Sequence, residues 1–96
     1  MIEFEWDQNN IKHVCDDYPE RGNTVFGVES VFYDPDFLVT SKRLIRGELR
    51  YYAVGVNSLE MVKAVVYTIS GTKVRPISCW PANKQTKRYY YENRKN

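Results

Sequence analysis

The most regular stretch of this 96-residue chain is GELRYYAVGVNSLEMVKAVVYTISGTKVRPISCW (residues 47–80). It holds three segments rich in β-branched and aromatic residues, separated by the short links NSLE (57–60) and SGT (70–72). Links of this length reverse the chain, so they predict an antiparallel β-meander. Pro76 lacks the N–H that a ladder requires, and we expect it at a strand edge or at a bulge.

Two further strands are predicted before the meander. FLVT (37–40) has the composition of a strand, and the polar, basic SKRLIR (41–46) predicts a loop that joins it to the meander. At the start of the chain, IEFEW (2–6) alternates apolar and acidic residues, which predicts a half-buried strand.

Two helices are expected between these strands. The Asp7 carboxylate can accept a free first-turn N–H, so it predicts a helix that starts near Gln8 and ends before Pro19. Thr24 can cap a second helix, which ends at YDPD (33–36) because the residue before a proline is displaced from the α region. The apolar residues of this second helix recur at helical spacing: Val25, Val28, Val31 and Phe32.

The segment PANKQTKRYYYENRK (81–95) predicts a C-terminal helix with Pro81 near its first turn. At about 100° per residue, its bases fall on one side and Tyr89 and Tyr90 on the other, where both rings are expected to pack on the sheet. The basic side comprises Lys84, Lys87, Arg88, Arg94 and Lys95, with Tyr91 among them. This side predicts contact with RNA or an acidic partner, and Tyr91 can stack on a nucleobase. The alternative is a solvated helix in which Tyr91 only covers the stems of its neighbours.

Length and composition predict a single soluble α+β domain over residues 1–96. No apolar run approaches a membrane span, and the N-terminus lacks the basic and apolar regions of a signal peptide, so we expect a cytoplasmic protein. Cys15 and Cys79 are then expected as reduced thiols. No His/Cys cluster has metal-ligand spacing, and we expect neither a metal ion nor another cofactor.

Charge is distributed unevenly along the chain. Residues 1–36 hold nine acids and two bases, a net charge of −7, whereas residues 37–96 hold twelve bases and three acids, a net charge of +9. A basic second half suits a polyanion such as RNA. The alternative is that the two halves neutralise each other on the folded surface.

Several motifs are specific as an ordered set. They are FEWD (4–7), the Asn10-x-x-His13 pair, VESVFYDP (28–35), GELRYYAVG (47–55), VVYT (65–68), VRPIS (74–78) and PANKQTKRYY (81–90). This set resembles the BrnT family, ribonuclease toxins of type II toxin–antitoxin operons with a RelE-like fold. The resemblance implies a small antiparallel sheet with helices, an RNA substrate, and a partner antitoxin that carries a ribbon-helix-helix DNA-binding part.

The resemblance also implies site residues. Glu48 and Arg50 match the acidic and basic positions of the family's Gly-Glu-x-Arg-aromatic strand, and Arg75 matches the Arg before its Ile-Ser. The basic positions and the tyrosine of the family's last helix fall on Lys84, Lys87, Arg88 and Tyr90. Metal-free RNA cleavage needs a base, cations around the phosphate and an acid. Glu48 is the candidate base, and Arg50 and Arg75 are candidate phosphate clamps because a guanidinium matches two phosphate oxygens. The alternative is an ordinary surface ion pair.

Two other residues invite a catalytic or binding role. His13 is the chain's only histidine, but its helix lies in the acidic half, and we expect it to bond a backbone carbonyl near the helix end. Trp80 can stack on a base, although we favour a place in the core where the sheet meets the last helix. Trp80 stands where many BrnT proteins have a basic residue, and Thr86 stands where many have Glu.

Two functions follow from these features. The first is metal-independent cleavage of mRNA by a toxin that its antitoxin neutralises. The alternative, which the departures at Trp80 and Thr86 favour, is a catalytically impaired RelE-like module that binds RNA or the antitoxin and acts in operon regulation. Direct DNA binding is not expected, because no second helix precedes the last one in helix-turn-helix geometry.

Overall fold

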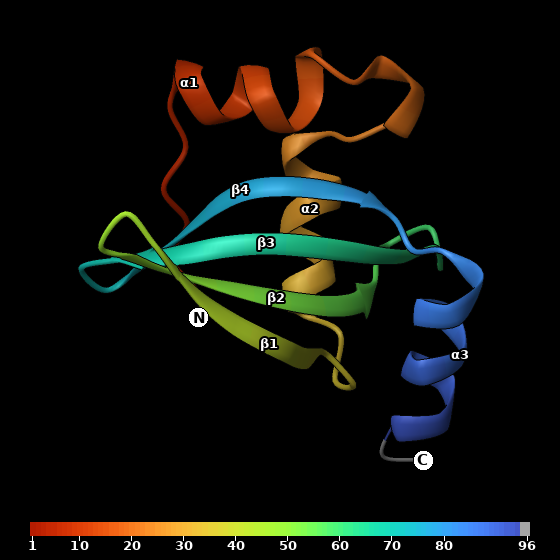
Figure 1. Ribbon diagram of the computed structural model, residues 1–96. Coiled ribbons are helices and arrows are strands. Elements are labelled where there is room, and N and C mark those ends of the chain that lie inside the picture. The colour runs from red at the N-terminus through yellow and green to blue at the C-terminus, as the bar shows by residue number, and fades with distance from the viewer. Residues whose placement is uncertain (95–96) are drawn as a thin grey trace.

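A four-stranded antiparallel sheet forms the centre of the computed structural model, which describes residues 1–94 (Figure 1). Its strands are β1 (Leu38–Ile45), β2 (Glu48–Val56), β3 (Val62–Ser70) and β4 (Lys73–Pro81), in the spatial order β1-β2-β3-β4. Each strand pairs with the next along the chain, so the predicted meander and the α+β class are confirmed.

Within residues 1–94, three α-helices accompany the sheet: α1 (Gln8–Ile11), α2 (Val25–Phe32) and α3 (Lys84–Asn93). A π-helical turn (Lys12–Asp16) extends α1, and a 3₁₀ turn (Pro19–Arg21) follows it. The predicted caps are confirmed, since Asp7 accepts hydrogen bonds from the first turn of α1 and Thr24 from the first turn of α2. In Figure 1, α1 lies beyond β4, α2 crosses behind the sheet, and α3 stands at the end where β4 finishes.

Two apolar clusters hold these layers together. The larger joins α2 and the π-helical turn to one face of the sheet, and its buried members are Val14, Val28, Val31, Phe32, Ala53, Val65, Tyr67 and Cys79. The smaller joins α3 to the sheet through Val54, Val62, Ala82 and Tyr90. Gly55 explains how α2 approaches so closely, because a Cβ there would lie 2.9 Å from the Val31 carbonyl oxygen. A strand glycine often marks such an approach of two backbones.

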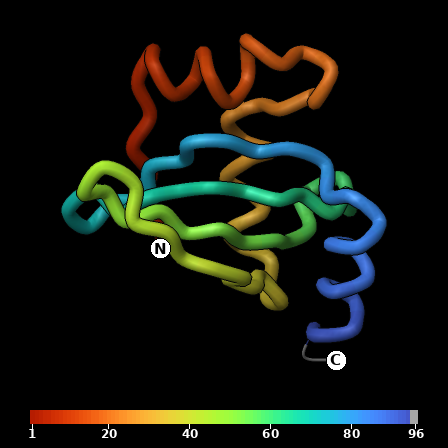
Figure 2. The backbone as a smooth tube through the Cα atoms, in the orientation of Figure 1, coloured from red at the N-terminus to blue at the C-terminus, as the bar shows by residue number. Residues whose placement is uncertain are grey.

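The N-terminal segment is not the strand that its alternation predicts. Only Phe4 forms a bridge, parallel to Val74 at the start of β4, with the Val74 carbonyl accepting from the Glu5 N–H at 2.8 Å. Figure 2 follows this segment past the start of β4 and on to α1. Alternation still identified the buried side, since Ile2, Phe4 and Trp6 pack against the larger cluster. The ladder ends after one bridge because Asp7 turns the chain into α1.

The predicted loop SKRLIR (41–46) is mostly strand. β1 continues to Ile45, and the true hairpin loop is Arg46–Gly47, with φ of 51° and 80°. Positive φ at both positions is typical of a two-residue hairpin turn whose twist matches the strands. The prediction was wrong because most of β1 is exposed on both faces, so its sequence lacks apolar alternation.

Two prolines mark the limits of β4. Pro76 pairs with Tyr67 beside a register shift that leaves Ile77 without a partner in β3, so the expected bulge on an edge strand is confirmed. Pro81 is the last residue of β4, not part of α3, and Asn83 caps α3 by accepting the Thr86 N–H at 2.8 Å.

Only one of the two tyrosines expected to pack on the sheet does so. The Tyr90 side chain is 2% exposed, whereas Tyr89 is 46% exposed. The Tyr90 hydroxyl donates to Asp34 Oδ2 at 2.5 Å and so ties α3 to the segment that follows α2. Lys95, expected on the basic side, lies outside the described residues. None of the helices within residues 1–94 is long and apolar enough to cross a bilayer.

Candidate active site

A pocket of about 270 Å³ lies where α1 and its π-helical turn meet the sheet. Glu48 and Arg50 from β2 and Arg75 from β4 all line it. The structure therefore brings together the three residues for which the resemblance implied catalysis. Other parts of its wall come from Asn9, Asn10, His13, Thr68, Pro76 and Ile77.

The β2 side of the pocket begins directly after the Arg46–Gly47 turn. Glu48 and Arg50 are two positions apart on one strand, so their side chains share a face, and Arg50 Nε donates to Glu48 Oε1 at 3.0 Å. A guanidinium has five N–H groups. Glu48 uses only the one on Nε, so within residues 1–94 both terminal nitrogens of Arg50 remain open to a further acceptor.

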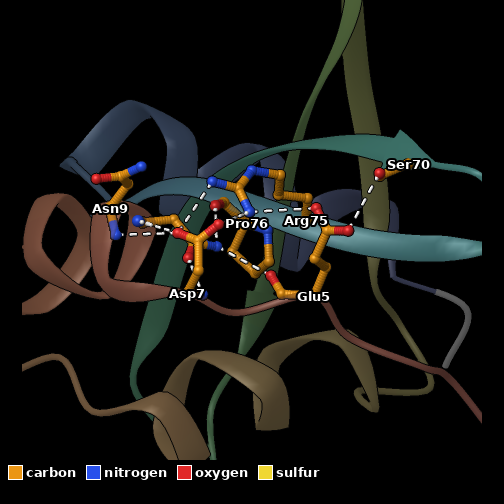
Figure 3. A network of polar contacts seen from close by, with 7 residues as sticks. Glu5, Asp7, Asn9, Ser70, Arg75 and Pro76 are labelled. Atoms are coloured by element: carbon orange, nitrogen blue, oxygen red, sulfur yellow. Dashed lines mark hydrogen bonds and ion pairs between the residues drawn. The ribbon is translucent and has the colours of Figure 1, made fainter.

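Arg75 is held more firmly, by carboxylates that the sequence did not predict as its partners (Figure 3). Its Nη1 and Nη2 donate to the two carboxylate oxygens of Asp7 at 2.9 and 3.2 Å, and Nη1 also donates to Glu5 at 3.2 Å. These three bonds leave Nε–H and one Nη2–H, which share one edge of the guanidinium. That edge has no partner within residues 1–94 and can still grip two oxygens of an anion.

The contact between Arg75 and Asp7 lowers the pKa of Asp7 and raises the pKa of Arg75. The hydrogen bond from Arg75 is the largest cause that lowers the pKa of the Asp7 carboxyl, and the helix N–H of Asn10 adds to it. In turn Asp7, followed by Glu5, raises the pKa of Arg75. The Asp7 carboxylate thus stays ionised at neutral pH and offsets the positive charge that Arg75 presents to an incoming phosphate.

Asn10 fixes the position of α1 against β4. Its side chain is buried, and Nδ2 donates to the carbonyls of Glu5 at 3.0 Å and Pro76 at 3.1 Å. Its Oδ1 accepts the Asp7 N–H at 2.7 Å and completes a capping box. All its bonds are internal, so Asn10 is a positioning residue that sets the wall opposite β2.

His13 lies in the pocket, which the sequence did not lead us to expect. The predicted bond to a backbone carbonyl is absent within residues 1–94, where the imidazole has one ring contact, with Tyr18, edge to face at 5.7 Å. The i, i+3 spacing of Asn10 and His13 was the signal that placed both on one side of the helix. The distance of His13 from the bases along the chain hides this placement in the sequence.

The predicted RNA-binding residues of α3 do not reach this pocket, and they occupy two separate hollows. Lys84 and Arg88 line one with Gln85. Lys87 and Tyr91 line another with Met61 and other residues. Arg94 lies over the Tyr91 ring at 4.9 Å, and the Tyr90 ring packs against it edge to face at 5.2 Å, so part of the Tyr91 ring is already covered.

Trp80 and the cysteines contribute little to the pocket. Trp80 is half-buried opposite Ala64 and belongs to neither core cluster within residues 1–94, so it is not the core plug that we favoured. Cys15 and Cys79 are free thiols. Burial raises the pKa of Cys79 to about 11, which keeps this thiol protonated at neutral pH and unsuited to attack.

Comparison with known proteins does not assign this chain to a family, and its side chains do not indicate a metal site within residues 1–94. No protein-family model matches this chain, and no curated protein matches it. The resemblance to BrnT proteins therefore rests on the motifs quoted above. Across residues 1–94, no three or more His, Cys, Asp or Glu side chains are grouped so that they could hold a metal ion.

Proposed function

We propose that this protein is a ribonuclease toxin of a type II toxin–antitoxin module, similar to BrnT proteins and with their RelE-like fold. Its substrate is mRNA, its reaction needs no metal ion, and a DNA-binding antitoxin neutralises it in the cytoplasm. The observation that carries this proposal is one pocket lined by Glu48, Arg50 and Arg75, which come from two strands that are not neighbours in the sheet.

The open donors of this pocket suit a phosphodiester. The two terminal nitrogens of Arg50 and the Nε edge of Arg75 are each a pair of N–H groups, the arrangement that grips two phosphate oxygens. Both guanidiniums can thus oppose the charge that grows on the phosphorane. Glu48 lies at the same wall as Arg50 and can take the proton of the attacking 2′-hydroxyl, since its bond to Arg50 holds it as an oriented carboxylate.

The hollows on α3 suit the rest of the RNA. Lys84, Lys87 and Arg88 are exposed and lie at the opposite end of the sheet from the β1–β2 turn, beside which Glu48 begins β2. Bases placed away from the reacting phosphate add affinity for the chain of phosphates without taking part in bond cleavage. An antitoxin that blocks them would present an acidic segment, which gains fast association from electrostatic steering.

One observation favours the alternative, a catalytically impaired module that binds RNA or the antitoxin. Arg75 is already paired with Asp7 and Glu5, so part of its charge is neutralised before any substrate arrives. Such a pocket binds an anion less tightly than two free guanidiniums would. Cleavage, not binding, therefore separates the two functions.

The test is cleavage of a defined RNA, with and without ribosomes, by purified wild type, Glu48→Gln and Arg75→Lys. We expect Glu48→Gln to lose about 10²–10⁴ in rate, the usual contribution of a general base. Arg75→Lys should cleave poorly and still bind RNA, because Lys keeps the charge but not the two-pronged grip. Glu20→Gln is the matched control, since Glu20 is exposed on the 3₁₀ turn away from the pocket.

The possible results distinguish an error in the assigned site residues from an error in the proposed function. Folded mutants that cleave as fast as wild type would show that the site is wrong. Wild type that binds RNA, fails to cleave it and fails to arrest growth when expressed would favour the binding module. Growth arrest that the product of an adjacent antitoxin gene relieves would support the toxin.

A further inference from the structure

His13 and Glu48 stand at opposite walls of the pocket. Glu48 belongs to β2, and β3 lies between β2 and the edge strand β4. Asn10 bonds the Pro76 carbonyl of β4 and so fixes the α1 wall, from which His13 projects one turn later. The pocket therefore has a carboxylate on one side, an imidazole on the other, and Arg75 between them.

We propose that His13 is a catalytic residue, the general acid that protonates the leaving oxygen while Glu48 acts as the base. This assignment rests on the proposed function. It gives the pocket the proton donor that Glu48, Arg50 and Arg75 do not supply, since both arginines keep their protons at all ordinary pH values.

The arrangement suits an in-line displacement. A base and an acid each approach their oxygen to about 2.6–3.2 Å. Glu48 on β2 and His13 on the helical turn beyond β4 line the same pocket from different elements, so a phosphate held by Arg75 can have one of them beside the entering oxygen and the other beside the leaving oxygen.

The imidazole is free to do this work. It is exposed, and within residues 1–94 neither ring nitrogen is engaged in a hydrogen bond. Its position depends on the π-helical turn, which closes with Asp17 N–H on the Lys12 carbonyl at 2.8 Å. A wider turn re-aims the side chains that it carries, and such turns are frequent at functional sites.

The step balances without water or a co-reactant. Glu48 takes the proton of the 2′-hydroxyl, and the 2′-oxygen forms a bond to phosphorus. The bond from phosphorus to the 5′-oxygen breaks, and this oxygen receives the proton from the imidazolium of His13. The products are a 2′,3′-cyclic phosphate and a free 5′-hydroxyl, and exchange with solvent restores both side chains.

Groups around His13 carry both signs. Arg75 on β4 and Glu48 and Arg50 on β2 share its pocket, Tyr18 contacts its ring, and Lys12, Asp16 and Asp17 belong to its own helical turn or follow it. A general acid must carry its proton to act, so the reaction slows as the pH rises past the point where that proton is lost.

The experiment compares two RNAs that differ in one atom. In the second RNA, sulfur replaces the leaving 5′-oxygen, and a thiolate leaves without a proton. We expect His13→Gln to cleave the normal RNA about 10²–10⁴-fold more slowly than wild type and the sulfur-substituted RNA at nearly the wild-type rate. Glu48→Gln should remain slow on both, and Lys12→Gln, beside His13 on the same turn, should match wild type.

Two further readouts complete the test. The decline in rate with rising pH should be present in wild type and absent in His13→Gln. An uncleavable 2′-deoxy version of the RNA should shift the NMR signals of the imidazole, which are unambiguous because the chain has one histidine. Circular dichroism checks the folding of the variant, and His13→Asn replaces it if Gln disturbs the turn.

Each outcome has one meaning. If wild type cleaves and folded His13→Gln matches it, or if sulfur does not rescue the variant, His13 is not the acid, and the proposed function stands. If wild type cleaves neither RNA, the proposed function fails and this assignment fails with it.

Discussion

Replacing Tyr90 with Phe removes one oxygen atom from the contact that ties α3 to the domain. The ring is 2% exposed, so Phe keeps its packing and leaves no cavity. The lost hydroxyl donates to Asp34 Oδ2 at 2.5 Å, while the Val56 N–H donates to the same oxygen at 2.8 Å and the Asp36 N–H to Oδ1 at 2.9 Å. Asp34 therefore keeps two backbone donors in the mutant.

A hydrogen bond to a charged group contributes about 1.5–3 kcal/mol. Because Asp34 is only half-buried and retains two donors, we expect the lower part of that range, a loss of about 1.5–2 kcal/mol in the free energy of unfolding. For a domain of this size such a loss lowers Tm by roughly 6–16 °C. Urea unfolding should show a lower midpoint at an unchanged m-value.

Tyr89→Phe is the matched control. It removes the same atom from the next residue, which is 46% exposed and whose hydroxyl bonds no group within residues 1–94. The expected change in unfolding free energy is within about 0.5 kcal/mol. If Tyr90→Phe costs no more than Tyr89→Phe, the Asp34 contact does not hold α3.

The same pair predicts a pH dependence. Burial, and then the bond to Asp34, raise the pKa of Tyr90 above that of a free tyrosine. An unfolded tyrosine ionises near pH 10, so above that pH the native state holds the proton more tightly and stability falls as pH rises. The stability that Tyr90 adds is thus complete below pH 10 and is lost above it. The gap between wild type and Tyr90→Phe should narrow there, and a constant gap would contradict this.

Two predictions concern the binding of RNA. Asp7→Asn keeps the helix cap, because Asn caps as well as Asp, and it removes the negative charge that offsets Arg75. Filter binding at low salt should therefore show tighter RNA binding by the variant than by wild type. Weaker binding would mean that Asp7 only positions Arg75. For wild type, about three phosphates neutralised by α3 should give a slope near −2 in log K against log salt. The variant with Ala at Lys84, Lys87 and Arg88 should lose most of this slope, and an unchanged slope would show that these bases are merely solvated.

Local patterns in the sequence were enough for most of the secondary structure. Short links between β-rich segments predicted the meander, and the capping side chains of Asp7 and Thr24 predicted where two helices begin. These signals depend on residues within about one turn or one hairpin of each other, so they can be seen without the fold. β1 was missed over residues 41–45, because an edge strand exposed on both faces has no apolar alternation to reveal it.

The pocket depended on contacts across the whole chain. Asp7 and Arg75 are 68 positions apart, and no local pattern links them. They meet because Asn10 docks α1 on the edge of β4 by bonding the Pro76 carbonyl, a contact over 66 positions. That docking also brings His13 opposite Glu48, although the two lie in halves of opposite charge. The sequence identified Glu48, Arg50 and Arg75 as candidates only through the family resemblance. The packing of α1 against the sheet decided the rest: it forms their shared pocket, pairs Arg75 with carboxylates, and places His13 in the same pocket.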